Sequence, residues 1–343
     1  MRRLLVLLIG LGAAVLAWRD VQSSLQAPLA VAAPMVVDVP RGATMNGLLR
    51  DLEGRGVLAS ARQRAYLAWY ARLTGQARLL KAGEYALAPG MRATDLTALF
   101  ASGQVVLHEL TLVEGWQFAQ ALAAVRAHAA LAHTLPADGA AAALMAALGA
   151  PEQHPEGRFY PDTYRFPRGT TDVEFLRRAH RAMARVLADE WAARAADLPY
   201  ATPDEALVMA SIVERETGMV DERPEIAGVF VRRLRQRMRL QTDPSVIYGL
   251  GAAFDGNLRK RDLLADGPYN TYTRAGLPPT PICLPGRAAL HAALHPAPGE
   301  TLYFVARGDG SHEFSETFAE HDAAVRKYQL KRGQAGRRAP AAR

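Results

Sequence analysis

Residues 202–218 read TPDEALVMASIVERETG, and this stretch carries a complete set of helix signals. Thr202 is the predicted N-cap, Pro203 occupies the first helical position, and Glu205 completes a capping box. Gly218 provides a stop signal after the last turn. The stretch therefore predicts one well-capped helix that carries two glutamates near its end.

The two glutamates, Glu214 and Glu216, are two positions apart, so their side chains leave the helix about 200° apart. Glu216 shares a predicted apolar face with Val208, Met209, Ile212 and Val213. A carboxyl group among aliphatic side chains is poorly solvated, which raises its pKa and keeps it protonated, as a general acid needs. We therefore predict that Glu216 is catalytic and that Glu214, on the opposite face, has a supporting role. From the helix alone, a solvated or arginine-paired glutamate is the alternative.

The composition is that of a basic chain. Its 343 residues are enough for about two domains, half of them are hydrophobic, and the net charge is +7. Such a surface favours anionic partners, namely nucleic acid, lipid headgroups or a polymer that bears carboxylates. No phosphate-binding glycine loop or nucleic-acid motif accompanies the charge, so we expect no nucleic-acid partner. The one cysteine, Cys283, excludes an internal disulfide framework and a multi-cysteine metal site.

The N-terminus predicts a membrane anchor. Arg2 and Arg3 precede an uncharged, mostly apolar run over residues 4–18. Basic residues ahead of such a run keep the N-terminus inside and export the rest of the chain. The run is shorter than a span of about 20 residues, so a cleaved signal peptide is the alternative. A poor cleavage site and an interfacial Trp18 favour an uncleaved transmembrane anchor over residues 1–20, followed by a tether over residues 21–34.

Two folded units are predicted after the tether. Residues 35–104 read as strand, helix, helix, strand and helix, which resembles the LysM-like module of cell-wall proteins; a generic small α+β domain is the alternative. Residues 105–330 combine helices with antiparallel strands and lack βαβ spacing, which predicts a larger α+β domain. The basic stretch 331–343 is expected to be a disordered tail.

Five motifs along the chain together resemble one family. They are EGRFYPDTYRF (156–166), ASIVERETG (210–218), MRLQTDPSVIYG (238–249), YNTYTRAGLPP (269–279) and LYFVARGDGSHEF (302–314). With them the chain resembles the endolytic murein (peptidoglycan) transglycosylases, the YceG-like family, from the N-terminal anchor to about Leu330. The motifs are long, ordered and rare, which makes the resemblance specific.

The resemblance implies a single-pass protein of the cytoplasmic (inner) membrane, with its N-terminus inside and its LysM-like and catalytic domains outside. It implies an enzyme that cuts nascent peptidoglycan strands internally, between N-acetylmuramic acid and N-acetylglucosamine, and leaves a 1,6-anhydro-muramoyl end. The catalytic glutamate of the family's Glu-Thr pair corresponds to Glu216, beside Thr217. Glu216 would act first as acid and then as base, without a cofactor or a metal ion. Peptidoglycan strands are the expected substrate, and peptidoglycan synthases are candidate partners.

Loops after the glutamate helix supply candidate sugar-binding side chains, because amides, hydroxyl groups and aromatic rings bind sugars through hydrogen bonds and stacking. The candidates are Gln241, Thr242, Asp243, Tyr248, Tyr269, Asn270 and Tyr272. Turn and cap chemistry before Pro244 is the alternative for Gln241 and Asp243. Asn270 is either a substrate ligand or a loop-holding amide, and Thr217 and His312 join Glu214 as supporting residues. Five arginines between 232 and 239 predict either a solvated face or a surface that attracts the carboxylates of peptide stems.

One position departs from the family pattern, and two other functions remain open. Cys283-Leu284 stands where the family usually has alanine and asparagine, so one substrate contact or a turn is expected to differ. A muramidase would need a second carboxylate near the scissile bond, such as Asp162 or Asp243. A non-catalytic wall-binding scaffold would have Glu216 in an ion pair. No second acid shares the predicted helical face of Glu216, so we favour the transglycosylase.

Overall fold

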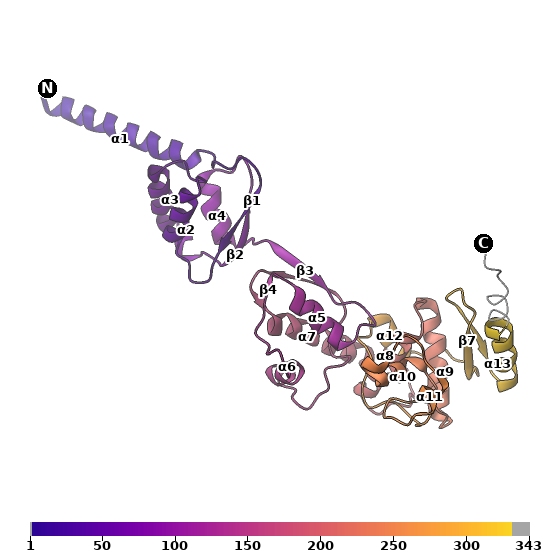
Figure 1. Ribbon diagram of the computed structural model, residues 1–343. Coiled ribbons are helices and arrows are strands. Elements are labelled where there is room, and N and C mark those ends of the chain that lie inside the picture. The colour runs from indigo at the N-terminus through magenta and orange to yellow at the C-terminus, as the bar shows by residue number, and fades with distance from the viewer. Residues whose placement is uncertain (1, 331–343) are drawn as a thin grey trace, which may run out of the picture. The chain divides into compact units, whose positions relative to one another are not determined.

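The computed structural model describes residues 2–330, and the predicted basic tail over residues 331–343 lies outside the described residues. The chain divides into two compact units (Figure 1). Unit 1 comprises Met1–Glu109 and Arg165–Thr170, and unit 2 comprises Leu110–Tyr164 and Thr171–Arg343. Helices and short two-stranded sheets make up both units, so the predicted α+β fold with an N-terminal apolar helix is confirmed.

Helix α1 (Arg2–Gln26) is long and apolar enough to cross a membrane. Its large apolar side chains between residues 4 and 18 are exposed, as a membrane-spanning segment requires. The helix continues beyond the predicted anchor, and Leu25, Leu29 and Val31 are buried in the core of unit 1. The segment predicted as a tether therefore packs into unit 1, because its apolar residues find buried partners there.

Unit 1 is built around an antiparallel strand pair covered by helices. After α1 its elements are β1 (Met35–Val39), α2 (Met45–Gly54), α3 (Ala61–Leu73), η1 (Gln76–Arg78), β2 (Gly83–Leu87) and α4 (Ala93–Ser102). Val37 on β1 lies opposite Tyr85 on β2, and both side chains are fully buried. Alternate residues of each strand face the helices, which is the pattern of a sheet with one buried face.

The next strands lead into unit 2. The division between the units falls within both β3 (Leu107–Thr111) and β5 (Thr163–Pro167), which form a two-stranded sheet. Two short strands, β4 (Leu131–Ala132) and β6 (Thr170–Thr171), form another. The first helices here are α5 (Phe118–Ala127), α6 (Ala140–Leu148) and α7 (Asp172–Ala192).

Helix α8 (Pro203–Glu216) is the central element of unit 2. The elements after it are η2 (Val220–Glu222), α9 (Arg223–Arg235), α10 (Asp243–Leu250), η3 (Gly251–Ala253), α11 (Lys260–Leu264) and α12 (Arg287–Leu294). Helices α7, α9, α10 and α12 all pack on α8. Every residue from Ala206 to Val213 is buried, so the prediction of a single apolar face was wrong: α8 is enclosed on all sides over these two turns.

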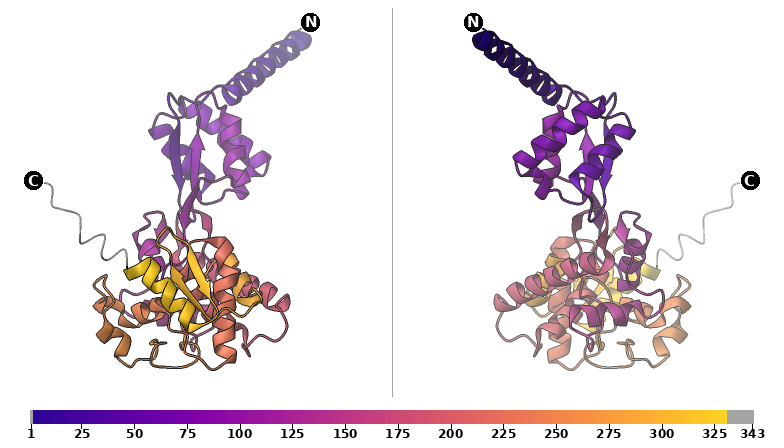
Figure 2. Two further views of the ribbon diagram at one scale, coloured as in Figure 1. Left: turned by 90° about the vertical axis from the view of Figure 1, so that its right-hand side faces the viewer. Right: turned by 90° about the vertical axis from the view of Figure 1, so that its left-hand side faces the viewer.

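The described part of the chain ends with a hairpin and a helix. Strands β7 (Tyr303–Ala306) and β8 (His312–Ser315) pair antiparallel, with Ala306 opposite His312. Helix α13 (Phe318–Val325) packs along this hairpin, and η4 (Arg326–Leu330) continues it (Figure 2, yellow). A capping box between Thr317 and Glu320 fixes the start of α13.

Candidate active site

Glu216 lies at the C-terminal end of helix α8. The predicted capping box is confirmed, since Thr202 Oγ1 accepts from the N–H of Glu205 and the Glu205 carboxylate accepts from the N–H of Thr202. The helix ends because Thr217 adopts an extended backbone (φ −142°, ψ 139°), one residue before the predicted glycine stop. Glu216 therefore occupies the last helical position, where it is partly buried.

Glu216 lines a cavity of about 460 Å³ in unit 2. The polar and aromatic residues that line it with Glu216 include Arg233, Gln241, Asp243, Tyr272, Tyr303, Phe304 and His312. Five segments far apart in the sequence thus meet here: the end of α8, the end of α9, the stretch leading into α10, the loop that contains Tyr272, and the β7–β8 hairpin with α13. Three of the predicted sugar-binding residues, Gln241, Asp243 and Tyr272, lie in this cavity.

Thr242 makes the direct contact with Glu216. It is the N-cap of α10, a position where a threonine hydroxyl ordinarily accepts from the helix's own N–H groups. Here no such bond forms, and Thr242 Oγ1 donates to Glu216 Oε1 instead. The preceding Gln241 has a left-handed backbone (φ 54°), which a non-glycine residue adopts only at a cost. The hydroxyl of Thr242 is therefore used for Glu216 and not for its own helix.

The environment of Glu216 favours its protonated form. Burial raises the pKa of Glu216 to about 7, and the nearby negative charge of Asp243 acts in the same direction. The hydrogen bond from Thr242 and the positive charge of Arg233 oppose the rise. The sequence predicted the raised pKa from aliphatic neighbours, but the groups around the carboxyl are a hydroxyl, a carboxylate and a guanidinium.

Asp243 is a second carboxylate in the same cavity. Its Oδ1 accepts from the hydroxyl of Tyr272 at 2.6 Å. No second acid was expected on the helical face of Glu216, and Asp243 reaches the cavity from a different helix, α10. The other candidate second carboxylate, Asp162, accepts from the N–H of Thr163 at 2.7 Å and is absent from the lining of this cavity.

Glu214 points away from the cavity into an ion pair. Its Oε1 accepts from Arg223 Nη2 at 2.8 Å and its Oε2 from the N–H of Gly286 at 2.9 Å, and both charged side chains are buried, with exposed fractions of 5 % and 6 %. Burial raises the pKa of Glu214, against the opposing effects of Gly286 and Arg223. Glu214 thus fastens α8 to the segment before α12.

Three predicted sugar-binding residues lie outside this cavity and hold other parts of unit 2 together. Tyr248 and Tyr269 pack edge to face with ring centroids 4.9 Å apart, and Tyr269 shares a hydrogen bond with Thr280 at 2.8 Å. Asn270 is buried and its amide donates to the carbonyl groups of Asp262, Leu263 and Ala265. For Asn270 the structure shows the loop-holding alternative.

Two of the buried charged residues of unit 2, neither of them among the predicted site residues, contact predicted site residues. Glu156, in the EGRFYPDTYRF motif, accepts from the N–H of Phe118 at 2.9 Å and from the Tyr248 hydroxyl at 3.2 Å. Burial raises the pKa of Glu156 to about 7, although these hydrogen bonds oppose the rise. Its motif could have identified it, because a glutamate amid aromatic residues is a candidate for burial.

Arg233 is the second, and it lines the cavity of Glu216. It donates to the carbonyl groups of Leu302 (2.7 Å) and Leu240 (2.8 Å), and its guanidinium lies over the Tyr303 ring. The sequence signal is its position three residues after Phe230, on the buried side of α9. The expected solvated arginine face is wrong for this residue, and Arg232 likewise donates to the carbonyl groups of Ala297 and Thr301.

The departure from the family pattern lies in a packed region. Cys283 and Leu284 are fully buried, and the N–H and carbonyl of Leu284 bond to Trp116 and Gly115 respectively. Cys283 Sγ donates to the Ser211 carbonyl on α8 at 3.3 Å. The two side chains therefore pack beneath α8, and neither lines the cavity of Glu216.

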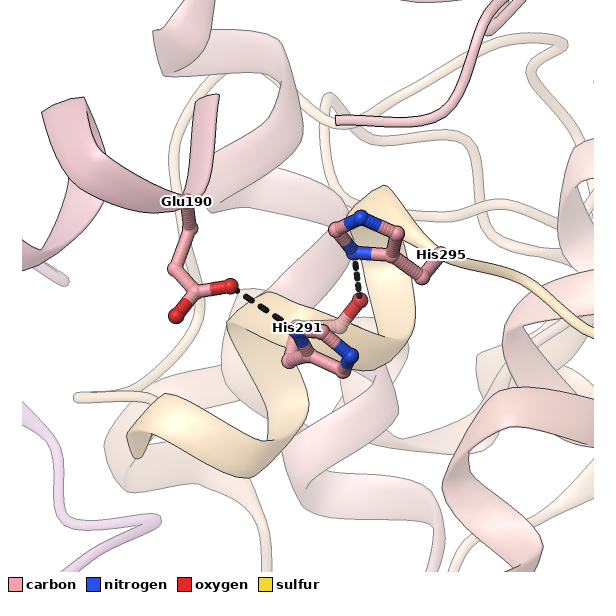
Figure 3. A group of neighbouring side chains, drawn as sticks. All are labelled: Glu190, His291 and His295. Atoms are coloured by element: carbon pink, nitrogen blue, oxygen red, sulfur yellow. Dashed lines mark hydrogen bonds and ion pairs between the residues drawn. The ribbon is translucent and has the colours of Figure 1, made fainter. Parts of the chain in front are cut away.

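Within residues 2–330, one group of three side chains could hold a metal ion: Glu190, His291 and His295, with candidate ligand atoms within 4.8 Å of one another. Figure 3 shows Glu190 on α7 facing His291 on α12, with His295 at the end of the same helix. The Glu190 oxygens already bind Arg287 (2.7 Å) and His291 (2.9 Å), and His295 Nε2 lies 2.8 Å from the Ala193 carbonyl. We interpret the group as an ion-pair cluster that joins α7 to α12.

Comparison with known proteins finds similar proteins that match most of the chain. The model of the YceG-like family matches residues 37–327. An endolytic murein transglycosylase of Bacillus subtilis is 30% identical over 308 residues, which cover 85% of this chain and 84% of that protein. An endolytic murein transglycosylase of Streptococcus pneumoniae serotype 2 is 27% identical over 336 residues, covering 86% of this chain and 58% of that protein.

A solved structure resembles the chain as well. The crystal structure of a protein described as yceG-like from Listeria monocytogenes has 29% sequence identity and a TM-score of 0.55, and the match covers 85% of this chain and 99% of that one. The similarity thus extends through both units.

Proposed function

The chain belongs to the YceG-like family, and on that premise we propose that it is an endolytic murein transglycosylase whose general acid is Glu216. Family membership confirms the resemblance predicted from the five motifs. The relatives act, by their names, on murein, so murein (peptidoglycan) is the proposed substrate.

One observation supports the role of Glu216. Its carboxyl group lines a cavity, accepts a hydrogen bond from Thr242 and has a pKa raised to about 7. Glycosidic cleavage needs a proton on the leaving oxygen while positive charge develops on the sugar. A carboxyl group with a pKa near 7 is half protonated at neutral pH, which suits proton donation. Gln241, Asp243 and Tyr272, in the same cavity, are the proposed sugar ligands.

The proposed reaction is intramolecular. After protonation by Glu216, the muramoyl 6-hydroxyl attacks the anomeric carbon of its own sugar and closes a 1,6-anhydro ring. Holding the nucleophile within the substrate gives an effective concentration on the order of 10⁵ M or more, which water cannot match. Cleavage between N-acetylmuramic acid and N-acetylglucosamine inside a strand would end its elongation.

The N-terminal helix supports a proposed location. We propose that α1 spans the cytoplasmic membrane with Arg2 and Arg3 inside and the remainder of the chain outside, where peptidoglycan is made. The part of unit 1 that follows α1 is the proposed LysM-like domain, and unit 2 is the proposed catalytic domain. Synthases that make the nascent strands at this membrane are the proposed partners.

The muramidase remains the second candidate, because Asp243 supplies a second carboxylate in the cavity. Mass analysis of the products separates the two. The full chain, purified in detergent, is incubated with purified peptidoglycan, and the fragment ends are weighed. Ends of 1,6-anhydro-muramic acid, lighter by one water, support the transglycosylase, whereas reducing-end muramic acid as the main product would replace it by the muramidase.

A further inference from the structure

His312, at the start of β8, lines the cavity that contains Glu216. Its Nδ1 lies 2.7 Å from Glu222 Oε2, and its ring packs edge to face on Phe304 with centroids 5.4 Å apart. Only 10 % of the His312 side chain is exposed. With Nδ1 bound to Glu222, Nε2 is the nitrogen left for a ligand in the cavity.

Glu222 fixes the orientation and the tautomer of this ring. Its Oε1 accepts from the backbone N–H of His312 at 2.8 Å, and its Oε2 accepts from the Thr217 hydroxyl at 3.4 Å. Burial disfavours the charged form of Glu222, but the hydrogen bonds from His312 outweigh this effect and lower its pKa. An ionised Glu222 accepts a proton-bearing Nδ1, so the lone pair of the neutral ring lies on Nε2. A carboxylate behind a histidine in this way orients it as a proton acceptor.

The proposed reaction requires two proton transfers, one to the leaving oxygen and one from the 6-hydroxyl. From the sequence, Glu216 was expected to perform both. The cavity instead contains two groups in complementary states: a carboxyl group and an oriented imidazole. We propose that His312 is a second catalytic residue, which takes the proton of the 6-hydroxyl while Glu216 protonates the leaving oxygen. The inference rests on the proposed function.

The step balances without any further reactant. The O6–H bond breaks and its proton goes to His312 Nε2, while O6 forms a bond with the anomeric carbon. The bond from that carbon to the leaving oxygen breaks, its electron pair stays on the oxygen, and the proton of Glu216 completes the new hydroxyl group. Glu216 ends as a carboxylate and His312 as an imidazolium ion, and solvent returns both to their starting states.

Other titratable groups face the same cavity. The charged groups are Arg233 on α9 and Asp243 on α10, and the other titratable groups are Tyr272, Tyr303 on β7 and His321 on α13. Glu222 on η2 is not part of the lining and contacts His312 directly. Glu222, in contact with His312 Nδ1, is the carboxylate that would face the imidazolium ion formed during turnover.

Rate profiles against pH test the assignment in the full chain with purified peptidoglycan. The wild-type protein should lose kcat/KM at high pH, where Glu216 loses its proton, and at low pH, where His312 gains one. His312→Gln should lower kcat on the order of 100-fold or more and remove the low-pH limb. Glu222→Gln should lower kcat less, because the ring remains but loses the anion that orients it. His133→Gln, an exposed histidine of unit 2, should retain both limbs.

Chemical rescue separates a proton acceptor from a structural residue. Imidazole added to His312→Ala should raise its rate in a concentration-dependent way, which a purely structural histidine would not allow. A His312→Gln protein that melts like the wild type and keeps its low-pH limb, or a rate within about threefold of the wild type, would overturn the assignment. The reaction products test the proposed function separately. If the His312 variants keep wild-type activity and the products end in 1,6-anhydro-muramic acid, only this inference is refuted. If the products have reducing ends, the proposed function itself is refuted.

Discussion

The hydroxyl group of Thr242 donates a hydrogen bond to the carboxyl group of Glu216, although Thr242 is the N-cap residue of its own helix, α10. The two residues are 26 positions apart, and Gln241, with its left-handed backbone, directly precedes Thr242. A hydrogen bond to a carboxylate stabilises the charged form, so this contact holds the pKa of Glu216 lower than burial alone would set it. The affinity of Glu216, the proposed general acid, for its proton is therefore adjusted by a residue outside α8.

Replacement of Thr242 by valine should shift the activity profile toward higher pH. The variant keeps the shape of the side chain but loses the donor, so the pKa of Glu216 should rise above about 7. A hydrogen bond to a charged group contributes about 1.5–3 kcal/mol, which corresponds to a shift of roughly one to two pH units. The high-pH limb of kcat/KM measures it. Thr74→Val, at an exposed position in unit 1, is the control, and an unmoved limb in Thr242→Val would refute the coupling.

The two glutamates of α8 should fail in different ways. Glu216→Gln should preserve the melting temperature and lower cleavage on the order of 100- to 10,000-fold, because the amide cannot deliver a proton. Glu214→Gln should stay active at low temperature but unfold more easily, by on the order of 2 kcal/mol, because Arg223 loses its charged partner. Thermal melts and cleavage assays on the two proteins suffice. A Glu214→Gln protein that is stable but inactive would contradict this assignment and give the catalytic role to Glu214.

Glu156 should make unit 2 less stable as the pH rises. Its pKa is raised from 4.5 to about 7 in the folded chain, so the folded state holds a proton that the unfolded state has already lost in this window. The contribution is complete below about 4.5 and is lost as the pH rises through about 7, a change on the order of 3 kcal/mol. Denaturant unfolding at a pH of about 5 and of about 8 measures the difference. Glu156→Gln should reduce it, whereas Glu300→Gln, an exposed control, should not.

Helix α1 should remain part of the mature protein. Its apolar side chains are exposed between residues 4 and 18, and its last turn is packed into unit 1 through Leu25. Cleavage near residue 18 would cut within this continuous helix and leave its packed end without the apolar part. The intact chain should therefore stay with the membrane fraction after a high-salt wash. An N-terminus found near Trp18 or Ala33 by sequencing of the mature protein would contradict this.

Local signals in the sequence predicted where helices begin, but not which distant residues surround each side chain. The capping box at Thr202 and Glu205 depends on neighbours in the chain, so it could be recognised without the fold. The choice of Glu216 over Glu214 rested on an apolar face, but α8 is buried all round over its middle turns. What distinguishes the two carboxyl groups is which distant segment each meets: Thr242 for one, Arg223 and Gly286 for the other.

The same limit explains the sugar-binding predictions. Residue type identified seven candidates, but an amide or a phenol serves equally well to hold a loop, as Asn270 and Tyr248 do. Arg233 and the pairing of His312 with Glu222 depend on contacts 69 and 90 residues apart in the sequence. No local pattern encodes such distances, and only the folded chain brings these groups to one cavity.

Asp243 decides between the two candidate reactions, since it is the second carboxylate in the cavity of Glu216. In the transglycosylase Asp243 is a proposed sugar ligand, its charge raises the pKa of Glu216, and its Oδ1 accepts a hydrogen bond from Tyr272. Asp243→Asn keeps an acceptor for Tyr272 but removes the charge, so the high-pH limb should move down by about one unit, opposite to Thr242→Val. The products should still end in 1,6-anhydro-muramic acid, and long strands should shorten before disaccharides accumulate. In a muramidase Asp243 would be the base or the nucleophile, so the same variant should lose on the order of 100-fold or more of its rate. Reducing ends from the wild type together with an inactive Asp243→Asn would establish hydrolysis in place of ring closure.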